Sequence, residues 1–374
     1  MSRSRFAMVL LASVLVALTG CGDKGKDGAA KDKATGDDAY LKGKTEVAFV
    51  VNVPARFWSI AEAGVLAASK EFKIKTEFFI PQNLQEGQKQ ILEDLMTRGI
   101  KGVAITPIDP DNQQALLNKV AANSFLITHD SDAPKSNRRY YVGVDNYSAG
   151  REAGKLVKEA LPEGGTVMIF VGNLGQMNAR QRRQGVIDEL MDRPQQDVNT
   201  AVFDPNSGEI KNAKYTILDT RTDDADTAKV AQQPQDALTK YPELGCMVGL
   251  FEYNPPAILN AVKGANRLGK TKIVGFDEAD DTLSGITDGH IQGTIAQQPY
   301  GYGYESVKIL AGLIRDDKKL LPDKQVIYLP PIVVKKDGPD KPTATEGSNG
   351  LTVNAKAYRA DVIAKLKARD EAKK

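Results

Sequence analysis

The chain has few histidines and almost no net charge, and each of these features excludes a class of function. Only two histidines, His129 and His290, occur in 374 residues, and neither lies at a spacing that metal sites use. The formal net charge is +2, and removal of Arg3 and Arg5 with a leader would bring it to about zero. A near-neutral chain offers no electrostatic basis for binding nucleic acid. We therefore expect no metal ion, no other cofactor and no nucleic-acid partner.

Long hydrophobic runs are also missing, because the apolar stretch at the N-terminus covers only residues 6–17. A membrane-spanning helix needs about 20 apolar residues, so this stretch is typical of a signal peptide. It leads into Leu18-Thr19-Gly20-Cys21, which resembles a bacterial lipobox. We predict a signal peptide over residues 1–20, lipidation of Cys21, and a periplasmic protein held to a bacterial membrane by that lipid. An ordinary signal peptide followed by a coincidental cysteine is the alternative.

The residues after Cys21 predict a tether followed by a folded body. Residues 21–43 comprise this cysteine and a stretch rich in Gly, Lys, Asp and Ala without apolar periodicity, which indicates a flexible segment. If Cys21 carries lipid, Cys246 is the only remaining thiol and no intramolecular disulfide can form. The fold must then depend on its hydrophobic core, and about 350 residues are enough for two domains.

Short β-rich runs alternate with amphipathic helical stretches from residue 45 onward. This alternation predicts βαβ units and parallel sheets. The pattern passes through five strands and then starts again, so we predict an α/β fold with two similar Rossmann-like lobes and a cleft between them. The expected strands are 46–51, 75–80, 102–106, 125–128 and 140–144 in the first set, 166–171, 214–218, 246–251, 272–276 and 293–296 in the second, and 326–328 and 332–334 near the end.

Polar and aromatic residues follow the predicted strands at their carboxyl ends, where ligands of open α/β sheets bind. Carboxylates and amides can each bridge two neighbouring hydroxyls, and an aromatic pair suits the apolar face of a sugar ring. Two of these assignments have structural alternatives, because the aromatic pair could be core and Asp145 could cap a helix. The candidate ligand-binding residues are Asn52, Phe57, Trp58, Asp130, Asp145, Asn178, Arg180, Tyr253, Asn254, Asp277 and Gln297.

These segments, taken in order, resemble the periplasmic substrate-binding proteins of sugar ABC importers, in the ribose-binding-like branch. The resemblance covers about residues 46–334 and implies the type I periplasmic binding protein fold, with two lobes joined by a three-strand hinge. The matching segments are Arg56-Phe57-Trp58, Leu126 to Asp130, Asp145-Asn146 with Gly150, Ala179 to Arg182 with Gly185, Val274 to Asp277, and Thr294 to Gln297.

The resemblance also implies domain boundaries. Residues 44–145 plus 298–325 would form the N-terminal lobe, and residues 146–297 plus 326–335 the C-terminal lobe. Residues 336–374 would be an extension of loop and helix, and we expect the apolar stripe of that helix to pack on one lobe. The roles implied for the site are a sugar sandwiched by Phe57 and Trp58, hydroxyls bound by Asp130, a donor at Arg180, and completion by Asp277 and Gln297.

The chain departs from the family pattern at two positions, so we predict a class of substrates and not a single sugar. Ser131 stands where ribose-binding members have an arginine, and no aromatic residue occurs near Ala225, where a third stacking ring is expected. We predict a monomer that binds a neutral pentose, hexose or sugar alcohol and delivers it to an ABC transporter permease by hinge closure. Catalysis is not expected, because no Ser-His-Asp or Cys-His arrangement is visible. The alternatives are an exported sugar-acting enzyme that uses Asp130 and Asp277 as paired carboxylates, and a ligand-sensing component for a membrane receptor.

Overall fold

The first lobe is built on a six-stranded sheet whose neighbouring strands are all parallel. The computed structural model describes residues 40–197 and 202–373, so the predicted signal peptide, Cys21 and the tether up to residue 39 lie outside the described residues. The sheet has the order β12-β5-β4-β3-β1-β2. Its strands are β1 (Val47–Val50), β2 (Thr76–Phe79), β3 (Gly102–Ile105), β4 (Phe125–His129), β5 (Tyr140–Gly143) and β12 (Val326–Tyr328).

The second lobe is built on a nine-stranded sheet of order β14-β15-β13-β11-β10-β9-β6-β8-β7. Its central strands are parallel, whereas β7, β13 and β14 each have an antiparallel neighbour. The strands are β6 (Gly165–Val171), β7 (Ile210–Lys211), β8 (Tyr215–Thr222), β9 (Cys246–Gly249), β10 (Lys272–Phe276), β11 (Gly293–Ala296), β13 (Ile332–Lys335), β14 (Thr343–Ala344) and β15 (Leu351–Asn354).

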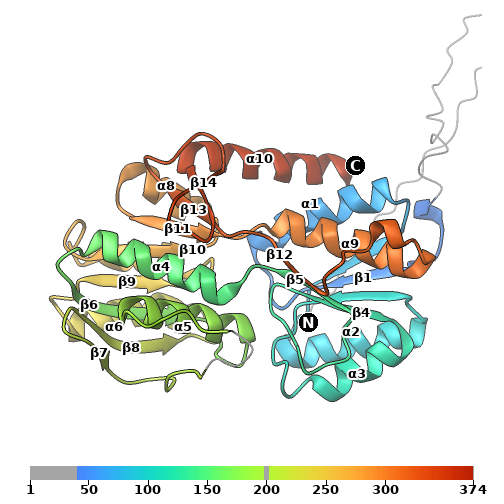
Figure 1. Ribbon diagram of the computed structural model, residues 1–374, viewed down its shortest axis with the longest axis horizontal. Coiled ribbons are helices and arrows are strands. Elements are labelled where there is room, and N and C mark those ends of the chain that lie inside the picture. The colour runs from blue at the N-terminus through green and yellow to red at the C-terminus, as the bar shows by residue number, and fades with distance from the viewer. Residues whose placement is uncertain (1–39, 198–201, 374) are drawn as a thin grey trace, which may run out of the picture. The chain divides into compact units, whose positions relative to one another are not determined.

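Helices cover both faces of each sheet (Figure 1). This is why β1 and β3 are uninterrupted runs of four buried residues, as expected for parallel strands shielded on both sides. The helices are α1 (Arg56–Glu71), α2 (Leu84–Arg98), α3 (Gln114–Asn123), α4 (Asn146–Ala160), α5 (Met177–Leu190), α6 (Thr227–Lys240), α7 (Asn254–Gly264), α8 (Asp280–Asp288), α9 (Pro299–Arg315), the short 3-10 helix η2 (Lys318–Leu320) and α10 (Ala355–Ala372).

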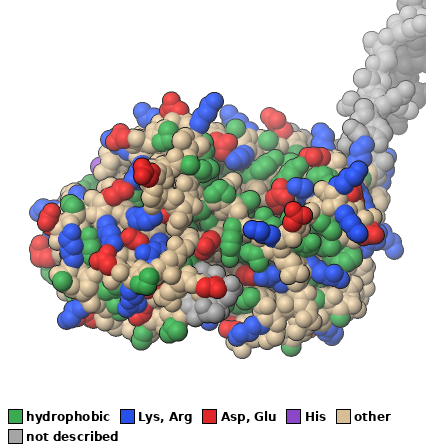
Figure 2. Space-filling view, viewed as in Figure 1, with side chains coloured by type: hydrophobic (Ala, Val, Ile, Leu, Met, Phe, Trp, Pro, Cys, Tyr) green, Lys and Arg blue, Asp and Glu red, His purple; other side chains and the backbone are tan. Residues whose placement is uncertain are grey.

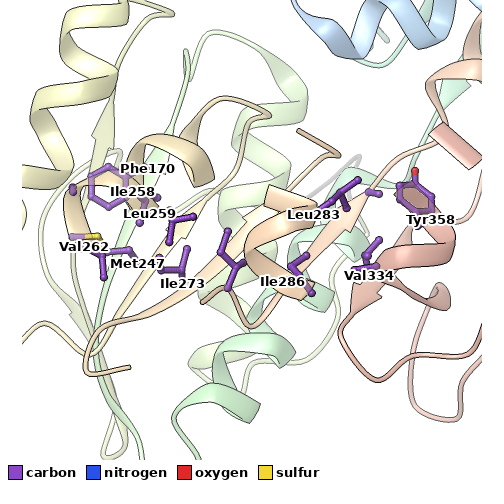
Figure 3. Packing of buried hydrophobic residues seen from close by; sticks show 14 of the residues in the cluster. Phe170, Met247, Ile258, Leu259, Val262, Ile273, Leu283, Ile286, Val334 and Tyr358 are labelled. Carbon is purple, nitrogen blue, oxygen red and sulfur yellow. The ribbon is translucent and has the colours of Figure 1, made fainter. Parts of the chain in front are cut away.

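Each sheet separates two hydrophobic clusters. In the first lobe, one cluster joins the sheet to α1 and α9 and the other joins it to α2 and α3. In the second lobe, α4 and α5 pack on one face, and α7, α8 and α10 pack on the other. Figure 3 shows this last cluster running from Phe170 to Tyr358 of α10. Cys246 lies in the core of β9, where burial raises the pKa of its thiol to about 12, so it is a packing residue.

The last crossover between the lobes differs from the prediction. We assigned residues 326–335 to the C-terminal lobe, but β12 pairs with β5 in register Val326 to Tyr141 and belongs to the first sheet. Only β13 of that range lies in the second sheet, so the chain crosses between the lobes at residues 329–331. The other crossovers lie between β5 and α4 and between β11 and α9.

The C-terminal extension also differs from the prediction, because it contacts both lobes. Strands β14 and β15 lengthen the second sheet, and α10 packs against α8 of the second lobe and α1 of the first. The sequence predicts that the apolar stripe of this helix packs on one lobe only.

Charges of both signs are mixed over the face shown in Figure 2. Within residues 40–197 and 202–373, no helix is both long enough and apolar enough to cross a membrane.

Candidate ligand-binding site

Two buried aspartates end equivalent strands of the two lobes. Asp130 follows β4 and Asp277 follows β10, and both have left-handed backbones, with φ of 58° and 65°. Each is held by its carbonyl oxygen, which accepts a hydrogen bond from the Tyr141 hydroxyl at 2.7 Å in the first lobe and from the Thr294 hydroxyl at 2.8 Å in the second. These bonds fix the turns, so the two carboxylates are positioned before any ligand arrives.

Arg182 of α5 lies between the two carboxylates. Its guanidinium is 3.3 Å from Asp130 and 4.0 Å from Asp277, and only 2% of its side chain is exposed. The same group lies over the ring of Phe276, 4.3 Å from the centroid. Burial raises the pKa of both aspartates, and the positive charge of Arg182 limits that rise. Arg182 therefore neutralises acidic groups contributed by both lobes.

A close helix–helix contact holds α5 in this position. Glycines at 150 and 185 let α4 and α5 approach backbone to backbone, because a Cβ on either would lie 2.2 Å from a carbonyl oxygen of the other helix. Asn146, at the start of α4, accepts a hydrogen bond from Nε of Arg182 at 2.8 Å. Asn178, one helical turn before Arg182, donates to Asp130 at 2.9 Å. The polar face of α5 is thus directed at the first lobe.

The structure corrects the predicted arginine. Arg180 is turned away from the carboxylates, pairs with Asp111 at 3.4 Å and is 24% exposed. Its position follows from helical geometry, because residues two apart on a helix lie on different faces, whereas Asn178 and Arg182 share one face. The four-residue spacing from Asn178 was the signal in the sequence that could have identified Arg182.

Phe57 and Trp58, at the start of α1, form the aromatic wall of the first lobe. Both are almost fully buried, and their rings meet edge to face, 4.8 Å apart at 90°. No sugar ring can fit between rings so close and perpendicular, so the predicted sandwich of the ligand by these two residues is wrong. The indole N–H of Trp58 donates to Asn52 at 2.9 Å, which fixes the ring and orients that amide.

The loop after β9 supplies the opposite wall. Glu252 accepts a hydrogen bond from the backbone N–H of Phe57 at 3.1 Å, a direct contact between the lobes. Tyr253 and Asn254 both donate to Asp223 at 2.9 Å. Asn254 therefore supports the loop from behind and does not line the space, contrary to the prediction.

Asp145 is the other predicted site residue that lies elsewhere. It caps α4, where its carboxylate accepts hydrogen bonds from the backbone N–H and the hydroxyl of Ser148 at 3.0 and 2.7 Å. The alternative interpretation of this residue as a helix cap is therefore correct.

The cavity enclosed by these groups has a volume of about 40 Å³. A single water site needs about 10–15 Å³, so the cavity is large enough for a few waters but not for a sugar ring. A sugar must displace the direct contacts between Asp130 and the pair Asn178 and Arg182. The lining residues are Asn52, Val53, Ala55, Phe57, Trp58, Asp130, Asn178, Arg182, Phe251, Glu252, Tyr253, Asp277 and Gln297.

A further carboxylate lies just behind the cavity. Glu278, next to Asp277, is 1% exposed, and neither of its carboxylate oxygens has a hydrogen-bond partner within residues 40–197 and 202–373. Burial raises its pKa well above the usual value, and the neighbouring carboxylates of Asp277 and Glu252 raise it further. No group of His, Cys, Asp or Glu side chains suited to a metal ion occurs among residues 40–197 and 202–373.

Comparison with known proteins agrees with this architecture. The sequence model of the periplasmic binding protein domain matches residues 47–319. The chain belongs to the periplasmic binding protein family. Both the family and the type I fold predicted from the sequence are thereby confirmed.

Individual relatives within this family are sugar-binding import proteins. The ribose import binding protein RbsB of Escherichia coli is 28% identical over 232 residues, which cover 61% of this chain and 70% of that protein. The protein of the same name from Haemophilus influenzae is 27% identical over 266 residues, which cover 70% of this chain and 82% of that protein. A solved ABC transporter solute-binding protein from Burkholderia graminis, in complex with D-arabinose, is 27% identical with a TM-score of 0.69, over 79% of this chain and 96% of that chain.

Proposed function

We propose that this periplasmic binding protein takes up a small neutral sugar between its lobes and delivers it to an ABC transporter permease. The observation that carries the proposal is the placement of Arg182 between Asp130 and Asp277, one carboxylate from each lobe. Neighbouring hydroxyls of a pentose, hexose or sugar alcohol can donate to a carboxylate while accepting from a guanidinium. The ribose and D-arabinose named for the relatives support this class of ligand.

The remaining lining residues suit the same ligand. Trp58 and Phe57 offer apolar surface from the first lobe, and Phe251 and Tyr253 offer it from the second. The C–H face of a sugar packs against such rings while its hydroxyls reach polar groups. Gln297 donates to Asp277 at 2.8 Å and accepts from Tyr302 at 2.9 Å, so its amide has a fixed orientation.

Closure of the lobes couples binding to delivery. In the structure, Asn178 and Arg182 of the second lobe bond directly to Asp130 of the first. A sugar that bonds to both sides stabilises the closed form more than the open form and so shifts the population toward closure. The permease would then recognise the closed surface.

The predicted anchoring completes the proposal. The protein would act as a monomer in the periplasm, held to the membrane by lipid on Cys21. Metabolic labelling with a radioactive fatty acid should mark the wild-type chain and leave the variant Cys21→Ser unlabelled. Equal labelling of both chains would contradict the assignment of Cys21.

A ligand screen tests the proposed function. The mature chain with Cys21→Ser is heated in the presence of individual monosaccharides and sugar alcohols, and bound compounds are recovered and identified by mass spectrometry. A ligand at about 100 times its dissociation constant adds about 2.7 kcal/mol of apparent stability, which is a readily measured shift. We expect at least one sugar to stabilise the protein and to be recovered unchanged. Failure of the whole panel, or chemical conversion of the bound sugar, would contradict the proposal.

A further inference from the structure

The C-terminal segment lies outside the part of the chain that the family defines. The family match ends at residue 319, whereas β14, β15 and α10 occupy residues 343–372. The D-arabinose-binding relative is covered over 96% of its own length, but only 79% of this chain takes part in that superposition. The extension thus lies beyond the residues that the family model matches, and its contacts indicate what it does.

Its attachment to the second lobe is extensive. β15 pairs with β13 over four residues, and the side chain of Asn354 caps α10 by accepting a hydrogen bond from the N–H of Ala357. Tyr358 and Val362 are buried in the cluster that contains Leu283 and Val334 (Figure 3). This half of the extension is part of the second lobe's core.

Two hydrogen-bonded contacts connect α10 to the vicinity of the ligand cavity. The Tyr358 hydroxyl donates to the backbone carbonyl of Gln297 at 3.2 Å, and Gln297 in turn donates to Asp277. Arg359 forms a two-pronged pair with Asp280 at 2.8 and 2.6 Å. Asp280 also lies 3.8 Å from Arg56 of the first lobe, so one carboxylate is shared between α10 and α1.

The far end of α10 holds the first lobe directly. Lys373 is 2.6 Å and Arg369 is 4.0 Å from the two oxygens of Glu62 on α1. Ile60, also on α1 and 2% exposed, belongs to the same hydrophobic cluster as Tyr358 and Val362. Figure 1 shows α10 extending from α8 over to α1. The helix thus crosses the boundary between the lobes. It forms a connection between them in addition to the three chain crossovers.

We propose that α10 is a strap that holds the two lobes together and thereby slows opening and release of the ligand. The lobes cannot move apart without breaking the contacts of α10 on one side. The second-lobe side contains the pairing of β15 with β13 and the packing of Tyr358 and Val362 in that lobe's core. The first-lobe side contains the apolar contact to Ile60 and partly exposed ion pairs to Glu62, so the first-lobe contacts should break first. The strap contributes to the free energy of lobe closure, and this contribution is the same whichever sugar is bound.

Reversal of one charge tests the strap. Glu62→Lys places a third positive charge beside Arg369 and Lys373, and Glu62 does not line the ligand cavity. The matched control is Glu93→Lys, the same change at an exposed position on α2 of the same lobe. A chain that ends at Ala368 is a second variant, because it removes both basic residues but keeps Tyr358 and Val362.

The lobe separation is measured first without any sugar. Spin labels on Lys119→Cys and Asp236→Cys report the distance between the lobes; both positions are exposed, Cys246 is buried, and Cys21 is replaced by serine. We expect Glu62→Lys and the shortened chain to populate longer distances than the parent protein and Glu93→Lys. Combining Glu62→Lys with Arg369→Glu and Lys373→Glu should restore the parental distribution. Identical distributions in all these proteins would overturn the strap.

The ligand measurement rests on the proposed function, and it is made with the sugar found in the screen. Loss of an exposed ion pair weakens an equilibrium by up to about fivefold, so each strap variant should bind the sugar up to about fivefold more weakly and release it faster. If no sugar binds the parent protein, the proposed function fails while the spin-label distances still decide the strap. Unchanged release rates in both strap variants would contradict it.

Discussion

Arg182 lies between the carboxylates of Asp130 and Asp277, so a conservative change of this residue tests the site most sharply. Arg182→Lys keeps the positive charge but removes the planar group that reaches several partners at once. In the structure that group donates to Asn146, to the carbonyl of Leu250 and to Asp130, at 2.8, 3.2 and 3.3 Å. A lysine ammonium cannot span these positions from one nitrogen.

The size of the effect follows from the bonds lost. A hydrogen bond to a charged group contributes about 1.5–3 kcal/mol. Loss of one such bond to the sugar should therefore weaken binding by roughly 10- to 150-fold. Arg182→Ala would cost more, because leaving a buried charge without its partner destabilises a protein by about 3–5 kcal/mol. The lysine variant is preferred, since it keeps a positive charge beside Asp130 and Asp277.

The assay is isothermal titration with the sugar identified by the screen. The matched control is Arg180→Lys, the same change two residues earlier on α5, at a side chain that is 24% exposed and paired with Asp111. Surface substitutions of this kind alter free energies by about 0.5 kcal/mol or less, so its affinity should stay within about twofold of the parent. Melting temperatures of both variants show whether each remains folded.

The opposite result for the two variants would contradict the assignment of Arg182 to the site. If Arg182→Lys binds the sugar as tightly as the parent while Arg180→Lys loses affinity, the assignment of the two arginines is reversed. The sequence-based choice of Arg180 would then be right, and the geometry of the cavity would not be that of the ligand-bound protein.

Three further changes separate binding from stability. Trp58 is the only tryptophan, so its fluorescence should change on titration with sugar, and Trp58→Ala should weaken binding by about 1 kcal/mol in calorimetry; an unaltered affinity would place the ligand elsewhere. Asp145→Ala removes a helix cap and should lower the free energy of unfolding in urea by about 1 kcal/mol without changing the affinity, and the opposite pattern would return Asp145 to the site. The pKa of Glu278 is higher in the folded protein than in the unfolded chain. The stability that protonated Glu278 contributes is therefore fully present at a pH below its pKa in the unfolded chain, and it is lost as the pH rises toward its pKa in the folded protein. Glu278→Gln should therefore raise the melting temperature more at pH 8 than at pH 5, whereas an equal change at both would show that Glu278 does not titrate in this range.

Much of the fold follows from local sequence patterns. The buried apolar runs of the central strands and the alternation with amphipathic helices are enough to predict parallel sheets, because such strands need cover on both faces. Eight of the predicted site residues line the cavity for a related reason, since carboxyl ends of parallel strands converge at one edge. They are Asn52, Phe57, Trp58, Asp130, Asn178, Tyr253, Asp277 and Gln297.

The errors have physical causes that a strand pattern does not reveal. Asp145 and Asn254 also follow strands, but they satisfy nearby polar groups, and only the folded backbone shows which role an amide or carboxylate takes. The ring geometry of Phe57 and Trp58 depends on the packing of α1 against the sheet. The short strand β12 has a sequence that could pair with either sheet. Its partner, β5, is therefore determined by the tertiary fold and not by a local pattern. The two-lobe contact of α10 requires the relative placement of α1 and α8, which no local pattern contains.

A crystal structure of the protein with the sugar found in the screen would show whether Arg182 and the two aspartates hold the ligand. We predict electron density for an intact sugar between the lobes, with its hydroxyls within hydrogen-bond distance of Asp130, Asp277 and Arg182 and its apolar face against an aromatic ring of the cavity. A sugar bound outside this cavity, or bound there without contact to Arg182 and either aspartate, would contradict it.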